Sequence, residues 1–134
     1  MLIYIILNVI AIFMIPLPFL VLWLCEEKIE PDNTLKMYIL IKDDIDLGHA
    51  MLAVGHGVLA CYREFECDPV MQNWFKNSYR KVVCKVNQKE FDNAKLFPKY
   101  VLMTESALDG GETAIVLCPR QEWPKALKWY KLYR

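Results

Sequence analysis

The chain has 134 residues, and its 16 lysine and arginine residues balance 16 aspartate and glutamate residues. This length allows one domain, and the absence of net charge argues against strong nonspecific binding to RNA. The five cysteines are an odd number without the C-x-x-C spacing of a zinc or redox pair, which indicates a reducing compartment. We therefore predict neither a metal site nor a cofactor.

Residues 1–25 contain no charged side chain, whereas every acidic and basic residue of the chain comes later. As a helix, residues 2–25 would span about 36 Å, which is enough to cross a hydrocarbon core of about 30 Å. A cleaved signal peptide is the alternative, but no basic residue precedes the apolar run and no small-x-small pattern precedes Glu26. We therefore predict an uncleaved transmembrane anchor over 1–25.

The polar segment 26–35 is predicted to be a short linker that holds a globular domain, residues 36–134, close to the bilayer. Lys28 and Lys36 lie on this side of the apolar segment, and the other side has no charged side chain. Because lysines favour the cytoplasmic side of a membrane, we expect a single-pass membrane protein with a cytoplasmic domain.

Apolar patterns predict the elements of the globular domain. Residues 36–42 form a short apolar run bounded by lysines, which is typical of an interior strand. From His49 onward, apolar residues recur every three to four positions, which predicts a helix with one buried face. The predicted elements are strand 36–42, helix 48–64, helix 69–77, strand 80–86, helix 88–96, strand 99–105, strand 112–118 and helix 120–130.

This order of strands and helices predicts an α/β fold. Asp109, Gly110 and Gly111 stand between the last two strands and form a hairpin signal, so that pair should be antiparallel. The connections through helices imply that the rest of the sheet is at least partly parallel. We expect a single three-layer domain whose four-stranded mixed sheet is covered by helices on both faces.

The junction between the first strand and the first helix is the predicted ligand site, because such junctions favour ligand binding in α/β sheets. Two glycines inside this helix, Gly55 and Gly57, each cost about 1 kcal/mol relative to alanine. Tight packing on the sheet and close approach of a ligand both explain them. The predicted ligand pocket consists of Gly48, Met51 and Gly55.

Two histidines, His49 and His56, are seven residues apart and so lie on about the same helix face. Zinc sites on helices use a spacing of three or four residues, and no third ligand is suitably placed, so we reject a metal interpretation. His49 follows a cluster of acids, which can make it half of an acid–base pair. A solvated turn whose acids favour the helix start is the alternative.

The segment 35–62 resembles the opening of the type 2 peptidyl-tRNA hydrolase family, K-M-x-L-V-V-R-x-D-L-x-M-G-x-G-K-x-A-A-Q-x-x-H-A. Matching residues fall in register without a gap: Lys36, Met37, Leu40, Lys42, Asp44, Ile45, Leu47, Gly48, Ala53 and Ala60. Further on, 80–86 and 100–104 resemble the family's second and third strands, and 112–119, ETAIVLCP, resembles its closing strand. The resemblance implies the same mixed four-stranded sheet.

The resemblance also identifies departures at the site. The family's essential lysine aligns with Met51, which carries no charge. The family's glutamine and histidine align with Gly55 and Val58, and His56, within one turn, is the candidate for a displaced substitute. The family's loop aspartate aligns near Glu105, and Thr113 matches a threonine before the last strand. The candidate catalytic residues are therefore Glu105, Asp109, Thr113, His49 and His56.

The C-terminal segment, predicted as a helix, combines basic and aromatic residues: Arg120, Lys125, Lys128, Lys131 and Arg134 with Trp123, Trp129, Tyr130 and Tyr133. Nucleic acids and membrane interfaces both bind such surfaces, and an amphipathic helix with packed aromatics is the simplest explanation. Cys84 and Cys118 lie in apolar strand runs, where cysteine usually packs as a small hydrophobe.

Three functions fit these patterns. The first is a membrane-anchored hydrolase of the ester in peptidyl-tRNA or of a related ester, as the resemblance implies. The second is a catalytically inactive relative, a pseudoenzyme, that binds tRNA, a nucleotide or another small ligand. The third is a membrane-tethered module that binds a protein partner through its C-terminal aromatic and basic helix.

Overall fold

The computed structural model describes residues 30–134, so the predicted anchor over 1–25 and the linker up to residue 29 lie outside the described residues. In chain order the elements are β1 (Lys36–Lys42), α3 (Leu47–Glu64), α4 (Pro69–Asn73), the π-helical turn η1 (Trp74–Ser78), β2 (Arg80–Val86), α5 (Gln88–Ala94), β3 (Tyr100–Glu105), the 3-10 turn η2 (Ser106–Leu108), β4 (Gly111–Arg120) and α6 (Lys125–Lys128). None of the helices within residues 30–134 is long and apolar enough to cross a membrane.

The strands form one four-stranded sheet in the order β2-β1-β4-β3. β1 runs parallel to β2, whereas β4 lies antiparallel to both β1 and β3. The turn between β3 and β4 contains Asp109 and Gly110, both with positive φ (54° and 72°). The prediction of a single α/β domain with a mixed sheet and an antiparallel last pair is confirmed.

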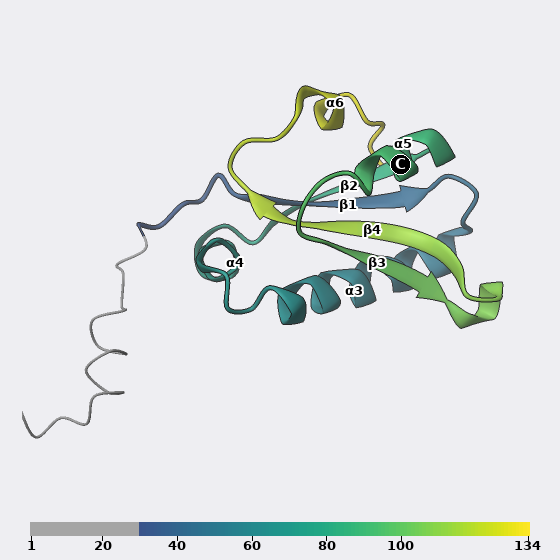
Figure 1. Cartoon of the computed structure of the whole chain (residues 1–134), viewed down its shortest axis with the longest axis horizontal. Coiled ribbons are helices and arrows are strands. Elements are labelled where there is room, and N and C mark those ends of the chain that lie inside the picture. The colour runs from purple at the N-terminus through teal and green to yellow at the C-terminus, as the bar shows by residue number, and fades with distance from the viewer. Residues whose placement is uncertain (1–29) are drawn as a thin grey trace, which may run out of the picture.

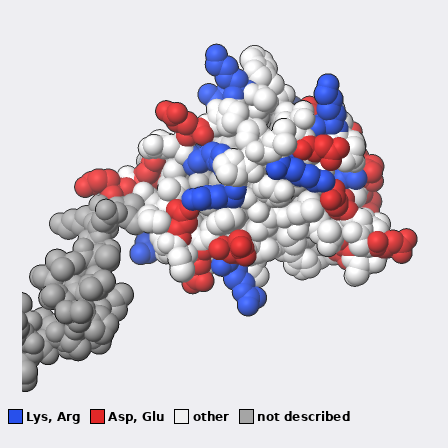
Figure 2. Space-filling view, in the orientation of Figure 1, with Lys and Arg blue, Asp and Glu red and all other residues white. Residues whose placement is uncertain are grey.

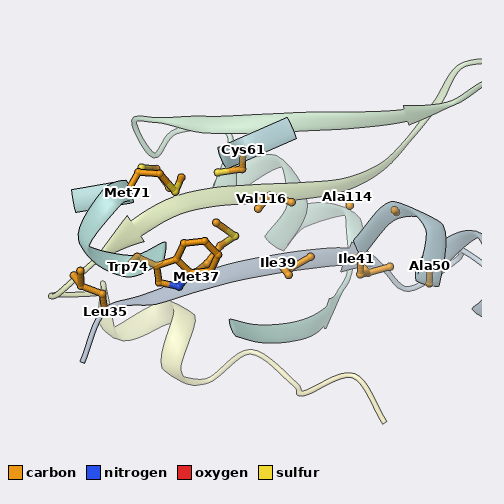
Figure 3. Close-up of a cluster of buried hydrophobic side chains, with 12 residues drawn as sticks. Leu35, Met37, Ile39, Ile41, Ala50, Cys61, Met71, Trp74, Ala114 and Val116 are labelled. Carbon is orange, nitrogen blue, oxygen red and sulfur yellow. The ribbon is translucent and has the colours of Figure 1, made fainter. Parts of the chain in front are cut away.

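Helices lie on both faces of the sheet, with α3 and α4 on one side and α5 and α6 on the other (Figure 1). Side chains of β1 alternate between two buried clusters, one on each face of the sheet. Ile39 packs in the cluster beneath α3, which we call the α3 core, and Leu40 packs in the cluster beneath α5, which we call the α5 core. Because both faces are covered, β1 is a continuous apolar run rather than an alternating one. The α3 core, shown in Figure 3, extends from Leu35 near the start of β1 to Ala50 in α3.

Helix α3 begins where Asp46 accepts a hydrogen bond from the backbone N–H of His49 at 3.3 Å, which caps the helix. Its buried face carries small side chains: Ala50, Ala53, Gly57 and Cys61. A Cβ atom at position 57 would lie 2.5 Å from Val116 Cγ2 of β4, whereas one at position 55 would meet nothing within 4 Å. Tight packing therefore explains Gly57 and does not explain Gly55.

We expect Gly57→Ala to lower the free energy of unfolding by about 1–3 kcal/mol, because the added methyl group overpacks the contact with Val116. Gly55→Ala is the matched control, and it should raise stability by up to about 1 kcal/mol, because alanine is the better helix former on an open surface. Urea unfolding followed by far-ultraviolet circular dichroism measures both. Equal effects at the two positions would contradict the packing explanation.

The predicted C-terminal helix over 120–130 is wrong, because only Lys125–Lys128 is helical. Pro124 has no N–H and restricts the backbone of Trp123, so the helix begins after it. Beyond α6 the chain is extended and lies along the free edge of β2, where the N–H of Lys85 donates to the carbonyl of Lys131 at 2.8 Å. Tyr133 donates its N–H to the carbonyl of Val83 at 3.0 Å, so the tail satisfies edge groups of the sheet.

The described part of the predicted linker, Glu30–Leu35, is hydrogen bonded to the domain. Asn73 accepts from the N–H of Asp32 at 3.0 Å and donates to the carbonyl of Glu30 at 2.8 Å. Gln121 donates to the carboxylate of Asp32 at 2.6 Å, and Leu35 is buried in the core. The chain is therefore fixed against the domain from residue 30 onward.

Candidate functional site

The start of α3, the end of β1 and the hairpin between β3 and β4 lie at one end of the sheet. The register places Ile41 of β1 opposite Ala114 of β4, and Glu105 of β3 opposite Gly111 of β4. Most of the predicted catalytic residues therefore come from the same end of the molecule, at the carboxyl end of β1. This is the position at which open α/β sheets usually bind ligands.

His49 and Asp46 form the clearest polar pair at this end. The Nδ1 atom of His49 lies 2.5 Å from Oδ1 of Asp46, and the His49 side chain is 30% exposed. The hydrogen bond from the His49 side chain, together with that from its backbone N–H, holds the pKa of Asp46 below its usual value. Asp46 therefore stays ionised near neutral pH while it both caps α3 and orients the imidazole.

This pair has the geometry of a carboxylate and a histidine base. A carboxylate that accepts the Nδ1–H proton fixes the tautomer of a neutral histidine and leaves Nε2 as the basic nitrogen. In a histidine whose side chain is partly exposed, Nε2 can remove a proton from a water molecule that attacks a carbonyl carbon. The pair can therefore support hydrolysis without a metal.

Met51 lies on the other flank of α3. Residues 49 and 51 of a helix point about 160° apart, because each residue turns the helix by about 100°. Met51 is 67% exposed and borders a small apolar pocket of about 110 Å³, whose lining is Ile41, Leu47, Ala50, Met51, Val54, Val83 and Tyr133. The structure thus separates the position of the family's lysine from the His49–Asp46 pair.

The other members of the predicted pocket do not line this apolar pocket. Gly48 lies exposed in the first turn of α3, and Gly55 is exposed with open space around it. His56 is also exposed, two helical turns beyond His49. These three residues lie on the solvent side of α3, and of the predicted pocket residues Met51 alone borders the shallow apolar pocket.

The residues from the β3–β4 hairpin have local structural partners. The Oε1 atom of Glu105 accepts from the N–H of Ala107 at 3.3 Å and so caps η2, and Asp109 occupies an exposed left-handed turn position. Thr113 is 2% exposed, and its hydroxyl donates to the carbonyl of Met103 at 3.2 Å. Thr113 therefore connects β3 and β4, and Glu105 is a half-buried carboxylate that caps the turn η2.

The buried cysteines are unsuited to nucleophilic chemistry. Burial raises the pKa of Cys61 to about 12 and the pKa values of Cys84 and Cys118 to about 11. All three pack in the two cores as small apolar side chains. Among the residues that the structure describes, no group of three or more histidine, cysteine or acidic side chains is placed to hold a metal ion.

Sequence reasoning did not single out Asp46 from the neighbouring acids Asp43 and Asp44. The spacing Asp46-x-x-His49 is the signal that could have done so, because a residue at the N-cap position meets the N–H of the residue three positions later. Asp44 instead lies 3.7 Å from Lys42 in a partly exposed ion pair.

Comparison with known proteins gives one family match. The family model described as peptidyl-tRNA hydrolase PTH2 matches residues 35–117. This span begins one residue before β1, includes α3 with the His49–Asp46 pair, and ends within β4. A search of curated proteins finds no match to the chain.

Proposed function

We propose that this chain, which belongs to the peptidyl-tRNA hydrolase PTH2 family, hydrolyses the ester between a peptide and tRNA with His49 as the base. The observation that carries the proposal is the contact of 2.5 Å between His49 Nδ1 and Asp46 Oδ1 at the carboxyl end of β1. A charged carboxylate beside a partly exposed histidine is an arrangement that supports general-base hydrolysis of an ester.

In the proposed reaction, Nε2 of His49 takes a proton from water as the water oxygen attacks the ester carbonyl. The tetrahedral intermediate then collapses, and the ribose hydroxyl leaves with the proton that His49 returns. Asp46 stabilises the imidazolium that forms between these steps. Met51 supplies no charge to the developing oxyanion, and one missing electrostatic group typically costs about 10²–10³ in rate. We therefore expect slow turnover.

A second candidate function is binding without turnover. The outward face of α3 carries four exposed apolar side chains: Leu47 (62%), Met51 (67%), Leu52 (51%) and Leu59 (69%). An apolar face at the position of the family's lysine favours contact with a peptide or a protein rather than with a phosphate. This relative would keep the fold and bind its ligand through that face.

We also propose that residues 2–25 anchor the protein in a membrane with its domain in the cytoplasm. The support is the charge-free composition of this segment and the lysines that follow it. Retention in the membrane fraction after alkaline carbonate extraction tests the anchor, and release into the supernatant would contradict it.

The test of turnover is peptide release from peptidyl-tRNA by the full chain in a neutral detergent. We expect release by the wild type and a loss of about 10²–10⁴ in rate for Asp46→Asn. Asparagine caps a helix as well as aspartate does, so this variant removes the charge and leaves the start of α3 intact. Asp44→Asn is the matched control. It removes a carboxylate from the same turn, but this carboxylate pairs with Lys42 and not with His49.

Two results would contradict the hydrolase proposal. One is peptide release at an equal rate by the wild type and by Asp46→Asn. The other is no release by the wild type together with release by Met51→Lys, which restores the family's cation. The second result would identify the chain as a binding relative whose site has lost its charge.

A further inference from the structure

A cationic cleft lies at the opposite end of β1 from His49. Its volume is about 640 Å³, and it lies between the first residues of β1 and β2 and the segment that contains α6. We call it the α6 cleft. Its lining includes four cationic side chains, one carboxylate and one indole: Lys36, Arg80, Lys125, Lys128, Glu122 and Trp123.

The fold brings these cations together from three parts of the chain. Lys36 and Arg80 are the first residues of neighbouring parallel strands and are partners in the sheet register. Lys125 and Lys128 are the first and last residues of α6, which Leu127 fixes to the core with 1% exposure. In Figure 2, Lys and Arg side chains project at the top of the view, where Figure 1 places α6.

Within the part of the chain that the structure describes, the cations of the α6 cleft form no ion pair with a carboxylate. Within residues 30–134, the basic side chains in ion pairs are Lys42, His49, Lys95 and Lys99, and none of these lines the cleft. Among the described residues, Glu122 is the one carboxylate in the lining, so the lining that they form has an excess of positive charge. A concave site with an excess of cations attracts anions.

Trp123 forms an aromatic wall of the α6 cleft. Its Nε1 atom is buried and has no hydrogen-bond partner among the described residues, which typically costs about 1–3 kcal/mol. Its ring is fixed in place, with the Tyr38 ring centroid at 4.4 Å and the Arg120 guanidinium carbon at 5.0 Å. Because Nε1 is buried beneath the surface, the part of Trp123 that borders the cleft is its aromatic ring.

We infer that the α6 cleft binds phosphates of the tRNA backbone, at a contact separate from the ester. The identity of this RNA rests on the proposed function, whereas the excess of cations in the cleft does not. The six residue steps of β1 span about 20 Å, the length of roughly six phosphate spacings along one strand, so one tRNA can reach both His49 and the cleft. The cations line a concavity that a phosphate backbone can enter, whereas a bilayer presents a broad surface.

The salt dependence of tRNA binding by the full chain in neutral detergent tests this inference. The logarithm of the association constant falls linearly with the logarithm of salt concentration, by about 0.7–0.9 for each phosphate contact. We expect the double variant Lys125→Ala, Lys128→Ala to bind unacylated tRNA more weakly and to flatten this slope by about 1.4–1.8. Arg80→Ala alone should flatten it by about half as much.

The matched control is the double variant Lys76→Ala, Lys89→Ala, which removes the same charge from exposed positions outside the α6 cleft. An equal change of slope in the two double variants would overturn the inference. A second measurement compares binding to neutral micelles with binding to micelles that contain anionic lipid. If the Lys125→Ala, Lys128→Ala variant binds tRNA as the wild type does but binds anionic micelles more weakly, the cleft binds lipid headgroups and the inference is overturned. If the wild type binds tRNA through the cleft but releases no peptide, the proposed hydrolysis fails and this inference stands.

Discussion

His49→Ala is expected to lower kcat/KM for peptidyl-tRNA by about 10²–10⁴, the usual contribution of a positioned general base. The reason is the orientation of the ring. Asp46 holds Nδ1 at 2.5 Å, which leaves Nε2 as the only basic nitrogen available to the attacking water. Steady-state rates of peptide release, measured with the full chain in neutral detergent, give the size of the loss.

His56→Ala is the control for this prediction. His56 lies on about the same side of α3 as His49, is exposed, and has no side-chain hydrogen bond to a described residue. Its replacement should leave the rate within about twofold of the wild type, because surface changes rarely alter a site two turns away. An equal loss in both variants would contradict a specific role for His49.

Chemical rescue separates a lost base from a disturbed helix start. Alanine at position 49 leaves space for free imidazole, which can accept the proton in place of the missing side chain. We expect added imidazole to restore part of the activity of His49→Ala and none of the activity of Asp46→Asn, which keeps its own ring. Failure of rescue, together with a large loss of stability, would show that His49 acts only as a structural part of the α3 cap.

The fold could be predicted where one physical signal dominates. β1 and β2 have the predicted bounds. β1 is an apolar run bounded by lysines, and β2 is a short run rich in valine that ends before Asn87, so neither segment shows the apolar period of a helix. The prediction of a helix over 120–130 was wrong, because the spacing of its aromatic and basic residues fits an amphipathic helix when only the local sequence is considered. The N–H and carbonyl groups on the free edge of β2 instead bind the extended tail, and no local pattern near residues 129–134 reveals that edge.

The candidate site could be predicted only in part, because a site depends on which side chains meet across elements. The acid cluster before His49 indicated a carboxylate partner, and the structure identifies it as Asp46. The role of Thr113 depends on the register of β3 against β4, which places its hydroxyl at the carbonyl of Met103. The α6 cleft joins residues from positions 36, 80 and 125–128, and sequence order alone gives no reason to group them.

Trp74→Ala is expected to lower the free energy of unfolding by about 3–5 kcal/mol, the usual cost of removing a large aromatic side chain from a core. Trp74 is 1% exposed and lies in the α3 core beside Met37 and Leu35 (Figure 3). Its Nε1 atom donates to the carbonyl of Arg80 at 2.8 Å, which joins η1 to the first residue of β2. The variant therefore loses packing and a hydrogen bond at once.

Urea unfolding followed by far-ultraviolet circular dichroism measures this loss without relying on tryptophan fluorescence. Trp129→Ala is the matched control, because Trp129 is 86% exposed at the end of α6 and its removal should cost less than about 0.5 kcal/mol. Trp74→Phe keeps most of the ring contacts but leaves the carbonyl of Arg80 without the indole donor, so its cost should lie between those of the two alanine variants. If Trp74→Ala cost no more than Trp129→Ala, the turn η1 would not be part of the core that fixes the start of β2, and the position of Arg80 in the α6 cleft would need another explanation.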